Sequence, residues 1–166
     1  MKKILFGIAV LFAVLVFATG FDVTPESKKI SIGSDMPVVH LSNQKTKLDV
    51  GTSSDRYILM TFWESLDAES RIACSKYNTY FSHNKPEGLN VDFVAVNFDK
   101  DETLCREIIA IDNLDADTQF RLDNFQTLGL KAAFELDHGM GSVLVDPTGK
   151  IIAFNPSVSE LEKLIL

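Results

Sequence analysis

Thiols, paired carboxylates and an imidazole are the side chains of this sequence that could do chemistry. The chain has two cysteines, Cys74 and Cys105, and a thiolate can attack a disulfide sulfur. Asp67, Glu69 and His138 are residue types that bind divalent cations. The sequence has no Ser-His-Asp order, phosphate-cradling glycine loop or dinucleotide fingerprint. Hydrolase and kinase functions therefore have no support.

A buried strand and a helix are predicted to position the two carboxylates. Residues 57–62 are a continuous apolar run, which indicates a strand that is buried on both faces. Asp67 is a favoured N-cap type, and Glu69 places negative charge in the first turn of the helix that follows. An apolar stripe continues until residues 84–86 stop it. The simplest role of both carboxylates is to stabilise this helix terminus.

The remaining segments alternate between strand and helix patterns. In chain order they are a strand at 89–98, a helix for which Asp99 and Asp101 offer capping carboxylates, a polar stretch at 113–124, a helix at 125–136, a hairpin of strands at 142–145 and 150–154, and a helix after the capping box of Ser157 and Glu160. Two buried strands joined by a helical crossover pair in parallel, whereas hairpin strands are antiparallel. We therefore predict an α/β fold with a mixed central sheet, helices on both faces, and a C-terminal β-hairpin and helix.

The segment 62–71, FWESLDAESR, resembles the F-W-x-x-W-C-x-x-C-R signature of extracytoplasmic thioredoxin-like proteins of the TlpA and ResA kind. Residues 33–37 resemble the G-x-x-A-P motif of that family, and residues 144–152 resemble its L-I-D-x-x-G-K-I-V hairpin. The order and spacing agree over most of residues 30–166. The resemblance implies a thioredoxin-like domain over residues 30–166.

The departures from the family pattern fall on its redox site. Asp67 and Ser70 stand where the family has its two cysteines, with Ala68 and Glu69 between them. A carboxylate and a hydroxyl can neither form nor release a mixed disulfide. The cis-proline position of the family falls on Met140, where a non-proline cis bond would cost about 3 kcal/mol. We therefore expect a trans peptide there, a remodelled loop and no catalytic residue.

Cys74 leaves an enzymatic alternative open. It lies one turn after Ser70 on the same predicted helix, where a free cysteine is commonly buried. The family arrangement implies that the helix carrying Cys105 covers the opposite face of the sheet, beyond the roughly 7 Å Cα separation that a disulfide allows. We predict two unpaired thiols. The alternative is a thiol-disulfide oxidoreductase or antioxidant-type protein of the thioredoxin/TlpA family that uses Cys74.

The altered site retains groups that suit binding. Trp63 and Met140 are expected either to form a partly exposed apolar spot with an acidic rim, which suits a peptide or protein partner, or simply to pack. The main prediction is a redox-inactive binding or accessory module without cofactor or metal, and a cation site of Asp67, Glu69 and His138 is a third alternative. The candidate site comprises Trp63, Asp67, Ala68, Glu69, Ser70, His138 and Met140.

Charge and the first residues indicate the setting. The chain has 16 Lys+Arg against 23 Asp+Glu, a net charge of −7, which disfavours nucleic acid and anionic membranes as partners. Residues 1–20 have the pattern of a cleavable signal peptide, with an apolar run shorter than the about 20 residues of a membrane span. No cysteine lies near the cleavage site, so a lipoprotein is not expected, and residues 21–29 read as a flexible lead-in. We expect a periplasmic or secreted protein with a partner in the cell envelope, attached to the membrane only if the leader is retained.

Overall fold

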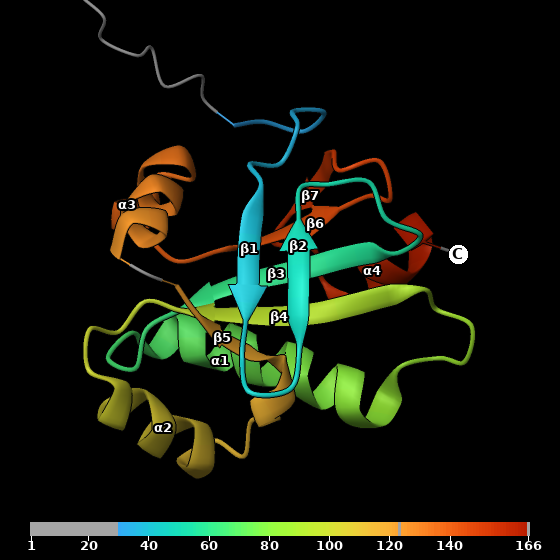
Figure 1. Ribbon diagram of the computed structural model, residues 1–166. Helices are drawn as coiled ribbons and strands as arrows, with labels where there is room; N and C mark the ends of the chain where they lie inside the picture. The colour runs from blue at the N-terminus through green and yellow to red at the C-terminus, as the bar shows by residue number, and fades with distance from the viewer. Residues whose placement is uncertain (1–29, 123, 166) are drawn as a thin grey trace, which may run out of the picture.

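A five-stranded mixed sheet with strand order β5-β4-β3-β6-β7 organises the structure, a computed structural model that describes residues 30–122 and 124–165. A separate antiparallel pair, β1 and β2, crosses in front of the sheet (Figure 1). The expected signal peptide, residues 1–20, and lead-in, residues 21–29, lie outside the described residues. The strands are β1 (Val39–Ser42), β2 (Lys47–Val50), β3 (Tyr57–Trp63), β4 (Val91–Asn97), β5 (Gln119–Arg121), β6 (Ser142–Val145) and β7 (Ile151–Phe154). The helices are α1 (Ala68–Thr79), η1 (Tyr80–Asn84), α2 (Glu102–Ile111), η2 (Ala116–Thr118), α3 (Asn124–Ala133), η3 (Leu136–His138) and α4 (Val158–Ile165).

The two central strands, β3 and β4, pair in parallel over their whole length, from Tyr57 opposite Val91 to Trp63 opposite Asn97. β3 pairs on its other side with β6, which is antiparallel to it. Nearly every residue of β3 and β4 is buried, because apolar side chains on both faces of a strand need cover on both sides. The predicted α/β fold with a mixed sheet and a C-terminal hairpin and helix is confirmed.

The sheet separates two apolar clusters, which show how its faces are covered. One cluster joins β3 and β4 to α1, α2 and α4 through Cys74, Cys105 and Leu161. The other joins the sheet to the β1–β2 hairpin and α3 through Leu41 and Leu130. Helices therefore lie on both faces, as predicted.

The prediction that the Cys105 helix covers the opposite face from α1 is wrong. The chain passes from β3 through α1 to β4, and then through α2 to β5, in one direction across the sheet. Parallel crossovers are right-handed, so two that run in the same direction place their helices on the same face. Cys74 and Cys105 accordingly belong to one cluster.

Three short strands were not predicted. The polar stretch 113–124 contains η2 and β5, and residues 39–50 form the β1–β2 hairpin. The third helix also ends earlier than predicted, at Ala133, since Glu135 adopts a left-handed conformation with φ 52° before η3 begins. The two predicted caps outside the site are confirmed. Asp101 accepts the Thr103 N–H at 2.8 Å, and the capping box pairs Ser157 N–H with Glu160 Oε2 at 2.8 Å.

Candidate functional site

Asp67 begins α1 directly after the loop that follows β3. Its backbone is extended, and its Oδ1 accepts the N–H groups of Glu69 at 3.1 Å and Ser70 at 3.4 Å. This satisfies donors that have no partner within the helix. The predicted N-cap is thus confirmed, and its carboxylate is engaged by the helix backbone.

Ser70 is buried one turn into the helix and ties it to the preceding loop. Its hydroxyl donates to the Asp67 carbonyl oxygen at 3.0 Å and accepts the Glu64 N–H at 3.2 Å. Both bonds give the Ser70 hydroxyl a structural role. The family resemblance places a redox-active cysteine at this position.

Polar contacts from distant parts of the chain hold the same loop. Glu64 pairs with Lys131 of α3 at 2.5 Å, and the Ser65 hydroxyl donates to Asp99 after β4. Sequence reasoning missed these contacts, because nothing in the sequence links loop residues to partners so far along the chain.

An ion pair fixes the first part of α1 to the end of α2. Arg71 donates from Nε and Nη2 to the two carboxylate oxygens of Asp112, at 2.9 and 2.7 Å. This bidentate bond raises the pKa of Arg71. The first part of α1 is therefore tied to the end of α2, and the loop before it is tied to α3.

A pocket of about 490 Å³ lies beside this helix start. Glu69, Ser70 and Ile72 line it from α1, and Met140 and Gly141 line it from the loop before β6. The structure thus brings together three of the predicted site residues, two on α1 and one on the loop. Ile72, which was not predicted, is 56% exposed and gives the pocket an apolar edge.

Asp67 and Ala68 stand at the helix start but are not among the residues that line the pocket. Leu66, just before them, is 89% exposed. Leu66 and Ile72 are therefore the most exposed of the apolar side chains named at the site, and Met140 is half-buried.

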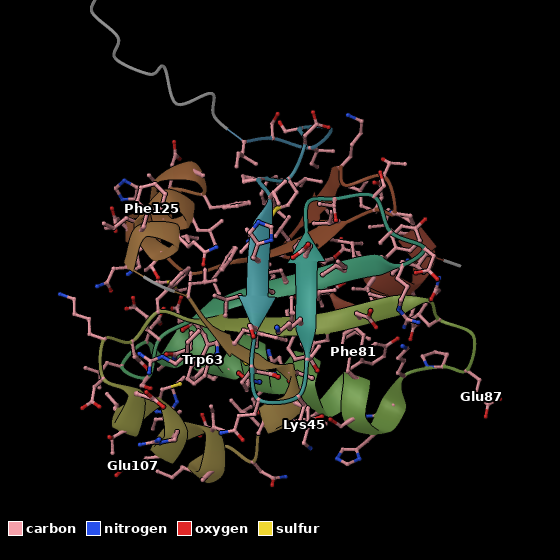
Figure 2. All side chains as sticks on the ribbon, in the orientation of Figure 1. Lys45, Trp63, Phe81, Glu87, Glu107 and Phe125 are labelled. Atoms are coloured by element: carbon pink, nitrogen blue, oxygen red, sulfur yellow. The ribbon has the colours of Figure 1, made fainter. Side chains whose placement is uncertain are left out.

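Trp63 is packed, which is the second of the two arrangements expected for it. Its side chain is 0% exposed, and its indole N–H donates to Gln119 Oε1 at 3.1 Å. Figure 2 shows Trp63 inside the molecule, in contrast to Phe125, which points outward from α3. Trp63 and Met140 belong to different clusters, so the shared exposed spot does not exist. Side chains of β3 alternate between the two faces of the sheet, and Trp63 points to the face that α1 and α2 cover. Met140 packs against the cluster on the opposite face.

His138 is exposed at the end of η3 and does not line the pocket. Within residues 30–122 and 124–165, no group of three or more His, Cys, Asp or Glu side chains is placed to hold a metal ion. The suggested cation site of Asp67, Glu69 and His138 is therefore not assembled. The peptide before Met140 is trans, as predicted.

Both cysteines are free and buried, and their thiols resist ionisation. Burial raises the pKa of Cys74 to about 12, although a hydrogen bond from Gln119 partly offsets this effect. Burial likewise raises the pKa of Cys105 to about 11. The predicted unpaired thiols agree with the structure, although the opposite-face reason given for them does not. Because the thiolate is the nucleophile in disulfide exchange, neither thiol is activated in the folded protein.

The architecture of the chain is similar to that of several solved structures. No family model and no curated protein matches the sequence. The structure is similar to a thioredoxin-like protein from Parabacteroides distasonis, with a TM-score of 0.67 and 24% identity over 82% of this chain and 96% of that one. It is also similar to the thioredoxin domain of a thiol-disulfide oxidoreductase from Bacteroides vulgatus, with a TM-score of 0.67 and 20% identity over 83% and 100% of the two chains. A third similar structure is that of a putative thiol:disulfide interchange protein DsbE from Chlorobium tepidum, with a TM-score of 0.58 and 18% identity over 82% of this chain and 94% of that one.

These similarities show that the chain has a thioredoxin-like fold, which confirms at the level of the fold the resemblance of segment 62–71. None of the helices within residues 30–122 and 124–165 is long and apolar enough to span a membrane.

Proposed function

We propose that this protein is a redox-inactive thioredoxin-like binding module of the cell envelope, which holds a peptide segment of a partner protein in the pocket between α1 and the loop before β6. One observation carries the proposal. The first turn of α1 has a capping carboxylate, Asp67, and a doubly hydrogen-bonded hydroxyl, Ser70, at the two positions where the resemblance implies redox cysteines.

The thiols of the chain support the absence of disulfide exchange. Cys74 is 0% exposed, and its pKa of about 12 leaves almost no thiolate at neutral pH. A substrate disulfide would have to enter the core to reach it. These features disfavour the alternative of an oxidoreductase that uses Cys74.

The pocket supports binding of a polypeptide. Ile72 and the half-buried Met140 offer apolar surface, and Glu69, Lys76 and Glu160 add charged groups of both signs to the lining. Concave sites of this composition suit a segment with an apolar side chain flanked by polar ones. The envelope location rests on the expected signal peptide at residues 1–20.

A turnover assay tests the loss of redox chemistry. Purified protein is added to insulin and dithiothreitol, with a working thioredoxin as the positive control, and precipitation of the reduced insulin is followed. We expect no acceleration over dithiothreitol alone. Turnover comparable to that of the thioredoxin, or rapid alkylation of Cys74 in the native protein at pH 6, would support the alternative instead.

Methionine-methyl NMR tests the binding site. The probe is reduced and alkylated insulin B chain, an unfolded polypeptide without a free thiol. We expect it to shift the methyl resonance of Met140 but not those of Met36 and Met60, which are buried. Ile72→Asp should weaken binding, whereas Ile111→Asp, on an exposed residue of α2 outside the pocket, should not. An unshifted Met140 resonance, or equal loss in both variants, would refute the proposed site.

A further inference from the structure

Half of β4 has an open edge. β5 pairs only with Ala95–Asn97 of β4, while Val91–Val94 extend beyond it, and no other described strand pairs with them on that side. The Asn90 carbonyl bonds to Tyr57 of β3, and backbone groups alternate in direction along a strand. The N–H and C=O of Phe93 therefore point away from β3, in line with the groups that Ala95 offers to β5.

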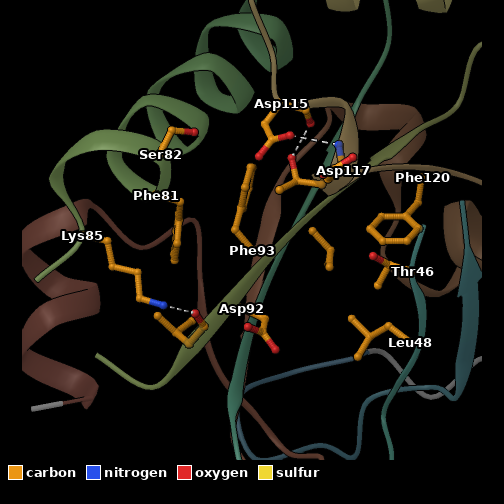
Figure 3. A pocket seen from close by; sticks show the side chains of 13 residues that line it. Thr46, Leu48, Phe81, Ser82, Lys85, Asp92, Phe93, Asp115, Asp117 and Phe120 are labelled. Atoms are coloured by element: carbon orange, nitrogen blue, oxygen red, sulfur yellow. Dashed lines mark hydrogen bonds between the residues drawn. The ribbon is translucent and has the colours of Figure 1, made fainter. Parts of the chain in front are cut away.

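A pocket of about 350 Å³ runs along this open edge. Figure 3 shows its walls: Phe81 and Lys85 on one side, Thr46 and Leu48 on the other. The rings of Phe81 and Phe93 stack with centroids 5.1 Å apart and form an apolar floor on the helical side. The open half-strand is four residues, or about 13 Å, long. The outward N–H of Val91 is bonded to the Leu89 carbonyl at 3.0 Å, and the Val91 carbonyl accepts from Lys85. The groove thus places the outward backbone groups of Phe93 beside an apolar lining.

The two ends of the groove carry opposite charge. At the Val91 end, Lys85 Nζ donates to the Val91 carbonyl at 2.8 Å, and the carboxylate of Asp92, which also lines the groove, is paired with Arg56 at 2.8 Å. Asp115 and Asp117 of the η2 region lie at the Val94 end (Figure 3). Asp117 pairs with Lys45 at 2.9 Å, but both side chains are largely exposed, so this pair is worth little and can be exchanged for another cation.

We propose that this edge is a second binding site, at which an extended segment of a partner protein adds to the sheet as a short strand beside Val91–Val94. The segment has alternating apolar residues, which rest on Phe81 and Phe93, and a Lys or Arg that faces Asp115 and Asp117. Main-chain hydrogen bonds to an open sheet edge supply affinity in this mode of recognition, and side-chain pockets supply specificity. The site is distinct from the pocket beside α1.

The shape of the groove selects a free segment rather than a second copy of the protein. The edge is recessed between the β2 side chains and η1 (Figure 3). Two copies that approached with the same recessed edge would meet at their walls before their β4 strands could pair. An extended peptide is narrow enough to enter.

The test uses a designed peptide, Lys-Val-Thr-Val-Thr with blocked ends, and amide NMR of the full protein. We expect the resonance of the Phe93 amide to shift and its hydrogen exchange to slow.

In a strand, the N–H groups of the Val residues of the peptide point to one edge and those of its Thr residues to the other. N-methylation of one set should therefore weaken binding about tenfold or more, through loss of the hydrogen bond to the Phe93 carbonyl and the clash of the methyl group with the edge, while methylation of the other set is tolerated. Glu in place of the peptide Lys should also weaken binding.

Two matched protein variants locate the site. Ser82 is exposed and lines the groove, so Ser82→Trp should block it without removing a core contact. His83 is its exposed neighbour outside the lining, so His83→Trp should bind normally. Equal binding of both N-methylated isomers, binding by Ser82→Trp, or shifts centred on Ser70 and Met140 would each overturn the proposal. Chemical shifts that depend on protein concentration without peptide would instead identify a second copy as the occupant, and would also overturn it.

Discussion

At the scale of single residues, Asp67 shows how a carboxylate can take a structural role where the resemblance implies a reactive sulfur. It caps α1 through two backbone N–H groups. We expect Asp67→Ala to lower the free energy of unfolding by about 1 kcal/mol, because a capping acceptor is lost. Asp67→Asn should retain most of the stability, since an amide oxygen also caps. Urea denaturation of the three proteins measures both effects.

The same pair of variants separates stability from binding. If Asp67→Ala unfolds at the wild-type urea concentration but no longer shifts the Met140 resonance with the alkylated insulin chain, then Asp67 contacts the partner rather than the helix. That outcome would contradict the structural role assigned to its carboxylate.

Trp63 and Gln119 provide a second residue-scale prediction. The indole N–H of Trp63, the single tryptophan of the chain, donates to Gln119 within the core. Gln119→Leu would leave a buried donor unsatisfied, and we expect a loss of about 1–3 kcal/mol in unfolding free energy. Because Trp63 is buried, we expect its emission to be blue-shifted and shielded from acrylamide in the folded state, and its change on unfolding reports the transition. Gln44→Leu, on an exposed hairpin residue, is the control and should change stability little.

At the scale of elements, the long apolar strands and capped helices were predictable, whereas the short strands were not. Seven consecutive residues of β3 carry the burial pattern of a central strand. β5 has three residues, and its pairing depends on the position of β4 rather than on its own pattern. The burial of Trp63 depends on which face of β3 it occupies, and the Arg71–Asp112 pair depends on how helices pack. Both are properties of the assembled fold.

The β1–β2 hairpin gives a prediction for an element. Gly51, just after β2, has φ +86°, and an added Cβ would lie 2.6 Å from the carbonyl oxygens of Met36 and Pro37. Gly33 has a similar φ of +87° with nothing within 4 Å of that position. Gly33→Ala should therefore lower the free energy of unfolding by about 1–2 kcal/mol, which is the cost of holding a residue with a Cβ in the left-handed conformation. Gly51→Ala should cost clearly more in thermal or urea denaturation, because the hairpin backbone must also move. Equal costs would mean that the close approach carries no energy.

At the scale of the whole molecule, the sheet and the helices on one face enclose both thiols in the same apolar cluster. Their ionisation is therefore linked to global unfolding. In the unfolded chain both thiols ionise near their ordinary pKa of 9.0, whereas in the folded protein the values rise to about 12 for Cys74 and about 11 for Cys105. Well below pH 9 neither state has appreciable thiolate, so this contribution to stability is complete. As the pH rises through 9 toward 11 and 12, the unfolded state loses protons first, and the contribution is lost.

We therefore expect stability to fall steadily from about pH 9 upward, and part of this fall to disappear in the double variant Cys74→Ala, Cys105→Ala. Burial also raises the pKa values of Tyr77 and Tyr80 above 10.0, so the comparison is sharpest between about pH 8 and 9.5, where the thiols of the unfolded chain ionise more than its tyrosines do. The variant is less stable at pH 7 because of the cavities it leaves, and only the slope against pH carries the test. A variant profile parallel to that of the wild type would mean that the thiols ionise equally in both states. They would then be accessible in the native protein, and the case for lost disulfide chemistry would fail with them.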